Sequence, residues 1–376
     1  MRILYVASDQ TLPGETGGSV HVHEVSRALA QLGHEVHAVV QDTGDVGAGD
    51  GYAIHRLRWK PQHRMFRWRA RPRISGLISS LKPDLVMERY YNFGGEGVLA
   101  ASDAGVPSLL EVNSPVIDHR GSLKAALDAA LIVRPMRRHR ERIVRAASAL
   151  ISPLQDIVPE FAHPKTHTIT WGANVDAFHP GRRSESRRRA WGATPETTVV
   201  LFSGSHRPWH GVHNLEQAAG LLKDRTDILF VFAGGERHGA ASEFRGLHLG
   251  RVPYRDMPEV TASADLSVAP YDRSRLRSLE LGFFWSPLKI FEALASGVPT
   301  ITLDIRPLNE IVRRDVEGTF VRENDPRDLA RAIRELADEP GRRRILGVNA
   351  RERAPRYSWA AHAKQIESIL EGLVRR

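Results

Sequence analysis

Apolar and polar positions follow one another along the chain in blocks that predict strands and helices in turn. Short apolar runs such as 108–112 have the length of buried strands, and apolar positions three and four apart, as in 20–32, predict helices between them. This alternation predicts an α/β protein with doubly wound, largely parallel sheets. The predicted strands are 2–8, 36–40, 54–57, 84–88, 108–112, 150–153, 167–171, 199–203, 228–233, 247–252, 266–269, 300–303 and 318–321.

The alternation is interrupted at 174–189, where turn-forming and charged residues gather. Such composition is typical of a domain boundary, although a long surface loop within one domain is the alternative. We expect a first domain at 1–180, a second at 181–356 and a C-terminal helix at 357–376. Doubly wound domains bind ligands at the carboxyl ends of their strands, so we expect a ligand in the cleft between the two.

The helix predicted to follow Ser286 is the most informative segment. Ser286 is expected as its N-cap, Pro287 as its first residue and Gly297 as its stop. A helix start offers free N–H groups and the positive end of the helix dipole to an anion. Lys289 and Glu292 share one face of the first turns, which would suit a nucleotide's phosphate and ribose. A capped helix with a surface ion pair explains the same pattern.

Two more loops follow predicted strands. The loop 204–211 carries Arg207 and His210 between two glycines. Arginine presents a fixed fork to phosphate oxygens, and His210 could donate a hydrogen bond or carry charge near neutral pH. The alternative is that both side chains only hold the loop. Gly17 and Gly18 in the first loop would let the backbone approach a ligand, but a tight turn would explain them equally well.

Composition narrows the chemistry. The chain of 376 residues contains no cysteine, which excludes disulfides, thiolate catalysis and cysteine-ligated zinc. No D-x-D, H-E-x-x-H or P-loop pattern occurs, so we expect no metal and no resident cofactor. The N-terminus lacks the apolar length of a signal peptide, and no apolar run reaches the ~18 residues of a membrane span. We therefore expect a cytoplasmic protein.

The net charge of +9 and the sequence pI of about 10.1 favour anionic ligands. Basic residues gather at 56–73, where aromatic residues are interleaved, and at 134–145. Either stretch could touch anionic lipid or nucleic acid, while a solvated basic face is the commoner explanation. We keep peripheral membrane contact as an option and expect no nucleic acid. The oligomeric state is left open by the sequence.

Taken together, these motifs resemble the GT-B-fold glycosyltransferases of family 4, also called glycosyltransferase group 1. The resemblance implies two Rossmann-like domains facing across a cleft, with the last helix crossing back to the first domain. It also implies a metal-independent transfer, with retention, from a UDP or GDP sugar to the hydroxyl of a small-molecule or glycan acceptor. The segments that carry the resemblance are 17–18, 21–24, 32–36, 171–180, 204–211 and 286–299.

The resemblance assigns roles to individual residues. Arg207 and Lys289 would stabilise the departing diphosphate, and Glu292 would bind the ribose. His21 would lie near the acceptor. The other residues expected around the donor are Gly17, Gly18, Gly204, His210, Gly234, Gly235, Val252, Ser286, Pro287 and Leu288.

The chain departs from the family's pattern at three places. Phe284 stands where the family often has the first of two glutamates. The usual arginine and lysine of the second-domain loop fall at Ser205 and His210. Asn113 replaces a histidine near the transferred sugar, so Asn113 and Glu111 are candidates near the reacting centre. The departures keep two alternatives open, namely a non-catalytic binder of nucleotide sugars or anionic polymers and a sugar-nucleotide epimerase or hydrolase.

Overall fold

The computed structural model describes residues 1–44, 49–60, 64–91, 94–119, 121–131, 134–235 and 244–375. The chain forms two compact units. Unit 1 comprises Met1–Trp171, Glu280–Ser286 and Trp359–Arg376, and unit 2 comprises Gly172–Leu279 and Pro287–Ser358. Of the basic stretch 56–73, Pro61, Gln62 and His63 lie outside the described residues.

Unit 1 is built on a seven-stranded parallel sheet in the order β3-β2-β1-β4-β5-β6-β7. Its strands are β1 (Arg2–Ala7), β2 (Glu35–Gln41), β3 (Ala53–Leu57), β4 (Leu85–Tyr90), β5 (Ser108–Val112), β6 (Ala149–Ser152) and β7 (Thr166–Thr168). Its helices are α1 (Gly17–Gln31), η1 (Arg64–Ala70), α2 (Arg71–Leu81), α3 (Glu96–Asp103), α4 (Leu123–Ala130), α5 (Pro135–Ala146), η2 (Gln155–Ile157), η3 (Glu160–Lys165) and α13 (Trp359–Val374).

Unit 2 is built on a six-stranded parallel sheet in the order β10-β9-β8-β11-β12-β13. Its strands are β8 (Thr198–Ser203), β9 (Ile228–Ala233), β10 (Gly246–Gly250), β11 (Leu266–Val268), β12 (Thr300–Leu303) and β13 (Gly318–Val321). The α-helices are α6 (Glu185–Ala190), α7 (Val212–Leu221), α8 (Met257–Ala262), α9 (Leu288–Ala295), α10 (Leu308–Ile311), α11 (Pro326–Asp338) and α12 (Pro340–Arg353). Short 3₁₀ helices are η4 (Pro180–Arg182), η5 (Pro208–His210), η6 (Tyr254–Asp256), η7 (Arg273–Arg275), η8 (Arg277–Leu281) and η9 (Ala354–Tyr357).

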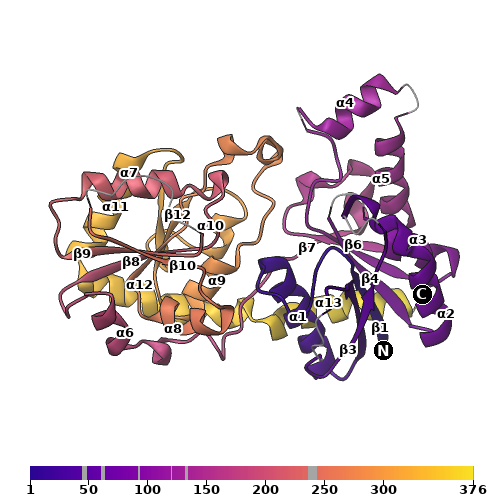
Figure 1. Cartoon of the computed structure of the whole chain (residues 1–376), viewed down its shortest axis with the longest axis horizontal. Coiled ribbons are helices and arrows are strands. Elements are labelled where there is room, and N and C mark those ends of the chain that lie inside the picture. The colour runs from indigo at the N-terminus through magenta and orange to yellow at the C-terminus, as the bar shows by residue number, and fades with distance from the viewer. Residues whose placement is uncertain are drawn as a thin grey trace. The chain divides into compact units, whose positions relative to one another are not determined.

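Both sheets are parallel, which confirms the predicted fold class. Parallel strands with helices on both faces are buried throughout, and this explains why β9 reads as one continuous apolar run. The C-terminal helix α13 belongs to unit 1, where it lies beside α1 (Figure 1) and buries Trp359, Ile366 and Leu370. Among the described residues, no helix is long and apolar enough to cross a membrane.

The two units divide after Trp171, whereas the sequence pattern placed the first boundary after residue 180. The intervening residues pack into unit 2, where Phe178 is fully buried with its ring 5.9 Å from that of Tyr254. Arg351 also donates to the carbonyl oxygen of Phe178 at 3.1 Å. The segment Glu280–Ser286 returns to unit 1, a crossing that the strand and helix pattern did not reveal.

Candidate functional site

Helix α9 begins at Leu288, two residues after the cap expected from the sequence. Pro287 is the N-cap, with φ −77° and ψ 117°, and no described side chain caps the helix. The expectation of Ser286 as N-cap is wrong, because its hydroxyl oxygen accepts a 2.6 Å hydrogen bond from the Trp171 N–H group. Gly297 follows the helix with φ 69°, as expected of a stop. The start of α9 therefore keeps its positive end available to an anion.

Lys289 places its cationic group against aromatic rings in unit 2. Its Nζ atom is buried, has no hydrogen-bond partner, and lies 4.2 Å from the ring centroid of Phe202 and 5.6 Å from that of Tyr271. No described carboxylate is within ion-pair distance of Nζ. Burial lowers the pKa of Lys289 to about 7, and Glu292 opposes that shift. An anion entering here would find a partially desolvated cation that none of the described carboxylates neutralises.

Glu292 lies on the next turn of α9 and is 5 % exposed. Its Oε1 atom is buried without a hydrogen-bond partner. Burial raises the pKa of Glu292 to about 7, although the Tyr254 hydroxyl and Lys289 both lower it. A surface ion pair is thus excluded as the explanation of this spacing, because both polar atoms are buried and do not pair. Each is left with unused capacity toward a ligand.

Two glycine loops of unit 2 meet at Lys289. Gly204 has φ 125°, and a Cβ atom there would lie 2.8 Å from Lys289 Nζ and 3.8 Å from His210 Nδ1. Gly234 has φ 99°, and its Cβ would lie 2.7 Å from the Gly204 carbonyl oxygen. Gly235 follows with φ 79°. The structure therefore gathers the predicted residues of the loops after β8 and β9 around the start of α9.

Arg207 and His210, the two candidate residues of the loop after β8, differ in charge and burial. Burial, and then Lys289, lower the pKa of His210 to about 3, so of the two roles considered for His210 a charge near neutral pH is excluded and a hydrogen-bond donor remains. His210 Nδ1 contacts the Ser205 carbonyl oxygen, which occupies the donor nitrogen of the neutral ring. Arg207 is exposed, with its guanidinium 5.3 Å from the Trp209 ring centroid. Val252 packs against the core of unit 2 between β10 and η6.

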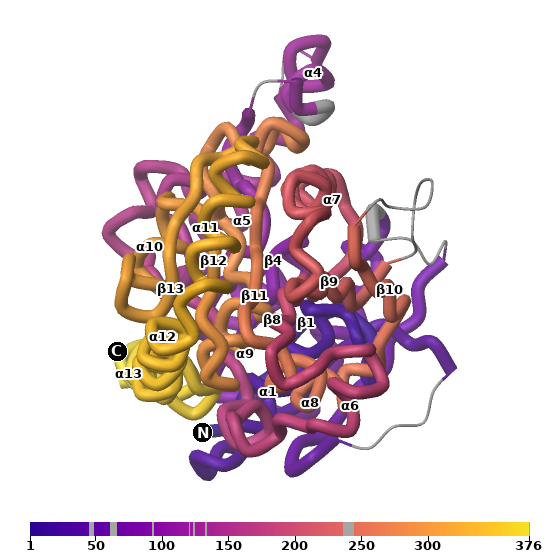
Figure 2. The backbone as a smooth tube through the Cα atoms, turned by 90° about the vertical axis from the view of Figure 1, so that its left-hand side faces the viewer, coloured from indigo at the N-terminus to yellow at the C-terminus, as the bar shows by residue number. Residues whose placement is uncertain are grey.

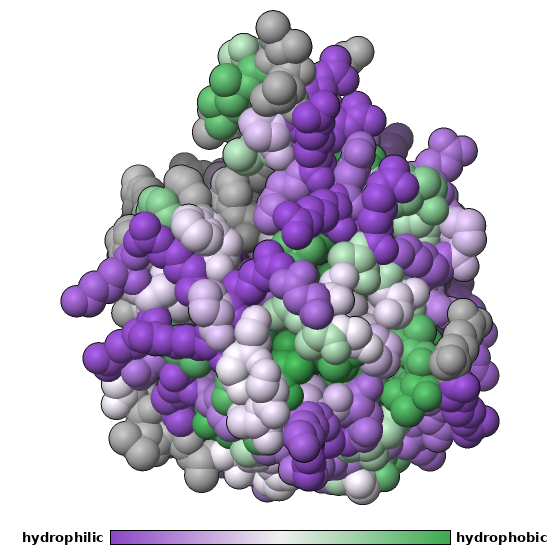
Figure 3. Space-filling view, turned by 90° about the vertical axis from the view of Figure 1, so that its right-hand side faces the viewer, coloured by the Kyte–Doolittle hydropathy of each residue, from purple (hydrophilic) through white to green (hydrophobic). Residues whose placement is uncertain are grey.

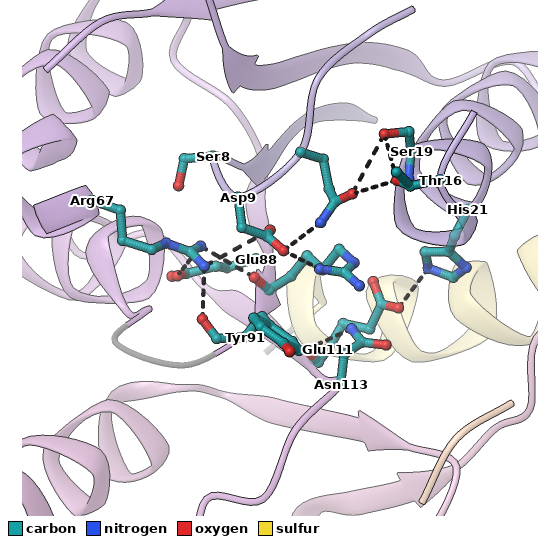
Figure 4. Close-up of polar contacts among 12 residues, drawn as sticks. Ser8, Asp9, Thr16, Ser19, His21, Arg67, Glu88, Tyr91, Glu111 and Asn113 are labelled. Atoms are coloured by element: carbon teal, nitrogen blue, oxygen red, sulfur yellow. Dashed lines mark hydrogen bonds and ion pairs between the residues drawn. The ribbon is translucent and has the colours of Figure 1, made fainter. Parts of the chain in front are cut away.

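In unit 1, Glu111 lies near the end of β5 with both carboxylate oxygens engaged, and Figure 4 shows the one that His21 contacts. The Tyr5 hydroxyl donates to Oε2 at 2.6 Å, and His21 Nε2 lies 2.5 Å from Oε1. Although burial raises it, His21, Arg89 and the Tyr5 hydroxyl bring the pKa of Glu111 down to about 2. Asn113, 6 % exposed, donates from Nδ2 to the Glu111 carbonyl oxygen at 3.3 Å. Glu111 is therefore an ionised carboxylate held by its neighbours.

His21 is fully buried, which does not fit the expected contact with an acceptor. Its ring stacks on Trp171 at 4.3 Å and meets the edges of Trp359 at 5.3 Å and His362 at 5.7 Å. These partners come from the end of unit 1's first segment and from α13. The Glu111–His21 pair therefore joins the carboxyl end of β5 to the places where the chain leaves and re-enters unit 1.

Gly17 and Gly18 are helical residues rather than loop residues. Helix α1 begins at Gly17, with the Thr16 hydroxyl accepting from the Ser19 N–H group at 3.2 Å. Neither glycine has a positive φ. A Cβ on Gly18 would collide with the side chain of Gln10, which occupies the space that a larger residue would need. The helix starts earlier than predicted because Thr16 is a favourable N-cap.

A buried ionic network beside Glu111 was not predicted from the sequence (Figure 4). Arg67 is fully buried, and its Nε atom bonds Glu96 Oε1 at 2.6 Å. Its other nitrogens lie 3.6 Å from Glu88 and 3.8 Å from Asp9. Arg89 also pairs with Asp9. The sequence offered one indication of this network, because two adjacent charged residues, Glu88 and Arg89, interrupt the otherwise apolar strand β4. In the described part of the chain, no group of three or more His, Asp or Glu side chains could hold a metal ion.

Two family models match this chain. Residues 16–176 match the model described as Glycosyltransferase Family 4, and residues 183–353 match Glycosyl transferases group 1. Together the two matches span most of the sequence and fall one on each unit. The chain therefore belongs to the group 1, family 4 glycosyltransferases. It is a glycosyltransferase that uses a nucleotide sugar.

Curated relatives and solved structures agree with this assignment. The chain is 28 % identical to D-inositol 3-phosphate glycosyltransferase 2 of Catenulispora acidiphila, over 93 % of this chain and 88 % of that protein. It is also 28 % identical to D-inositol 3-phosphate glycosyltransferase of Geodermatophilus obscurus, over 93 % and 84 %. Sucrose-phosphate synthase from Thermosynechococcus elongatus shares its fold with TM-score 0.76, 18 % identity and 99 % and 98 % coverage. Anabaena HepE in complex with UDP gives TM-score 0.74, 17 % identity and 99 % and 100 % coverage.

Proposed function

We propose that this glycosyltransferase moves a sugar from a UDP or GDP sugar to an acceptor hydroxyl with retention and without a metal ion. The observation that carries the proposal is a pair of buried polar atoms, Lys289 Nζ and Glu292 Oε1, that have no hydrogen-bond partner among the described residues. They are one turn apart at the start of α9, where no side chain of the described residues caps the helix. The cation and the free N–H groups of the helix start suit a diphosphate, and the carboxylate one turn further on suits the ribose.

The donor's phosphates are assigned to Lys289 and the start of α9. Positive potential from the ammonium group and from the helix dipole acts together there, in a setting of low dielectric where charge interactions are strong. Glu292 accepts hydrogen bonds from the ribose hydroxyls. Gly204 and Gly234 allow the ligand's oxygens to approach, because a side chain at Gly204 would strike the ammonium group. Arg207, which is exposed and has no described ion pair, adds a guanidinium beside the donor's phosphates.

In the reaction, the acceptor oxygen forms a bond to the anomeric carbon while the bond to the diphosphate oxygen breaks. Both events take place on one face of the sugar, which gives retention, and the acceptor's proton passes to the departing diphosphate. Lys289 and the start of α9 stabilise the negative charge that develops on the diphosphate. Glu111 is not assigned as a nucleophile, because Tyr5 and His21 already hold its two oxygens.

The acceptor we would test first is an inositol phosphate, because two relatives at 28 % identity are named D-inositol 3-phosphate glycosyltransferases. Other small hydroxylated molecules and glycan ends follow. The acceptor contacts and the cytoplasmic location of the activity stay predictions.

The test combines binding and product analysis in EDTA. We expect calorimetry to detect UDP or GDP, and Glu292→Gln and Lys289→Met each to weaken that binding by about tenfold or more. Lys223→Met, an exposed lysine in unit 2, is the matched control and should bind as wild type does. Transfer should require the acceptor and give a product with the donor's anomeric configuration. Equal donor consumption without acceptor would instead indicate a hydrolase or epimerase, and loss of activity in EDTA would refute metal independence.

A further inference from the structure

Helix α4 presents Leu127 to solvent and turns its acidic residue inward. Leu127 is 44 % exposed and Leu131, directly after the helix, is 48 % exposed, whereas Asp128 is 4 % exposed. Ala126, Ala129 and Ala130 are also exposed. Apart from its packing against α5, the helix protrudes from the rest of unit 1 (Figures 1 and 2). A surface helix of a protein without a partner shows the opposite orientation, so this helix is built to meet an apolar surface.

The inverted orientation of α4 is held by specific contacts. Asp128 accepts hydrogen bonds from the N–H groups of Met136 at 2.8 Å and Arg137 at 2.7 Å, and thereby caps the start of α5. Arg140, 4 % exposed, bonds Asp118 at 2.6 Å and lies 3.8 Å from Asp128. These buried charges fix α4 on α5 and keep Leu127 outward.

The neighbouring helix α5 carries a row of arginines without counter-ions. Arg138, Arg142 and Arg145 are exposed, and no carboxylate of the described residues lies within ion-pair distance of them. They line a groove of about 490 Å³ between α5 and α3, together with Leu99, Ser102, Asp103, Glu141 and Ala146. The two acids of this groove are already paired, Asp103 with Arg71 and Glu141 with Arg137. The groove therefore presents uncompensated positive charge.

We propose that α4 and the arginine row of α5 form a docking surface for an anionic membrane. Leu127 and Leu131 would enter the boundary between headgroups and acyl chains, and the arginines would bind the lipid phosphates. Figure 3 shows hydrophobic side chains at the protruding end of unit 1 beside a run of hydrophilic ones. Charge complementarity selects a lipid surface over a second copy of this chain, because two such surfaces would bring their arginines together.

Docking would also bring the carboxyl end of the unit 1 sheet, where we expect the acceptor, near the lipid. Only residues 114–122 separate Asn113, after β5, from α4. The carboxyl end of the unit 1 sheet, where Glu111 and Asn113 lie, would then be within about 30 Å of the start of the docked helix. This consequence rests on the proposed function, and it predicts that lipid-linked acceptors are used better on vesicles than in detergent.

The test is flotation of the full chain with vesicles of phosphatidylcholine containing about 30 % phosphatidylglycerol. We expect binding to these vesicles, little binding to pure phosphatidylcholine, and a loss when salt rises from about 0.1 M to about 0.5 M. Replacing Arg138, Arg142 and Arg145 by Ala should lower the partition coefficient about 100-fold, and replacing all three by Lys should preserve it. Leu127→Ser with Leu131→Ser should lower it about tenfold or more.

Matched controls come from unit 2. Ile345→Ser removes an apolar side chain that is 62 % exposed, and replacing Arg189, Arg334 and Arg344 by Ala removes the same charge. Neither should alter flotation. UDP binding, a property assigned to unit 2, should survive in all variants and shows that they are folded. Absence of vesicle binding, equal loss in the control variants, or a dimer in solution that Leu127→Ser dissociates would each overturn the proposal. Because flotation needs no donor, it can fail while the proposed reaction holds.

Discussion

Binding of UDP at pH 8 should take up a proton at Lys289. Burial lowers the pKa of this lysine to about 7 in the free protein, so only about 10 % of the side chains are charged at pH 8. A diphosphate against Nζ favours the charged form and raises the pKa. The complex would then hold about 0.9 more protons than its separated parts, and affinity should fall about tenfold per pH unit above pH 7.

Other titratable groups contribute little to the proton uptake at pH 8. Burial raises the pKa of Glu292 to about 7, so about 90 % of that carboxyl is already ionised at pH 8. A terminal phosphate with a second pKa of about 6 is ionised as well. At pH 6 the balance reverses, because Lys289 is already charged and Glu292 must lose a proton if the ribose requires its carboxylate. Proton uptake at pH 8 therefore reports on Lys289, whereas proton release at pH 6 would come from both Glu292 and the terminal phosphate, which is about half protonated there.

The assay is calorimetry at pH 8 in two buffers of different ionisation enthalpy, with EDTA present. The dependence of the observed enthalpy on the buffer should correspond to about 0.9 proton for wild type and to about zero for Lys289→Met. Glu292→Gln should retain the uptake, because loss of its charge lowers the pKa of Lys289 further. An uptake of zero in wild type, or the same uptake in Lys289→Met, would refute the placement of the diphosphate at Nζ.

The remaining predictions concern the steric room for UDP and the stability of unit 1. Gly204→Ala should weaken UDP binding about tenfold or more, because its Cβ would lie 2.8 Å from Lys289 Nζ at φ 125°. Glu111→Gln should lower the free energy of unfolding in urea by about 3 kcal/mol. Since the pKa of Glu111 is lowered from 4.5 to about 2, that difference should be constant above pH 5 and shrink as the pH falls below 4.5. Asp128→Ala should cost about 1–2 kcal/mol and speed hydrogen exchange at Met136 and Arg137.

Each of these has an outcome that contradicts it. Unchanged UDP affinity in Gly204→Ala would mean that the ammonium group moves aside freely. A Glu111→Gln protein as stable as wild type would show that the buried pair with His21 is energetically neutral. Protected amides at Met136 and Arg137 in Asp128→Ala would show that the cap does not hold α4 on α5.

Much of the fold could be predicted because parallel strands covered on both faces must be apolar along their whole length. The bounds of β5, β9, β12 and β13 were obtained from the pattern without error, and the parallel sheets follow from the helices that join most of the successive strands. Helix starts were less predictable. The φ of Pro287 suits either a cap or a first helical residue, so local sequence alone could not assign Ser286.

The candidate site, like the fold, has features that the sequence predicts and features that it does not. The spacing of Lys289 and Glu292 on one helix face, after a strand-end loop, is a property of the sequence and the helical period. Their pKa values near 7 are not, and neither is the lack of described partners at Lys289 Nζ and Glu292 Oε1. Both properties depend on how much water and which charges the surrounding strands leave around them. The same burial makes His210 neutral.

The sequence by itself determined the alternation of strands and helices, the absence of cysteine chemistry and the residue types available at each strand end. Only the tertiary structure decided which of those residues meet. Glu111 pairs with His21 across 90 positions of chain, and Arg67 enters a network with Glu88 and Glu96 that no periodicity indicates. Local patterns depend on neighbours three or four residues apart, whereas burial, pairing and charge state depend on contacts between distant segments. Those contacts exist only once the sheets have formed.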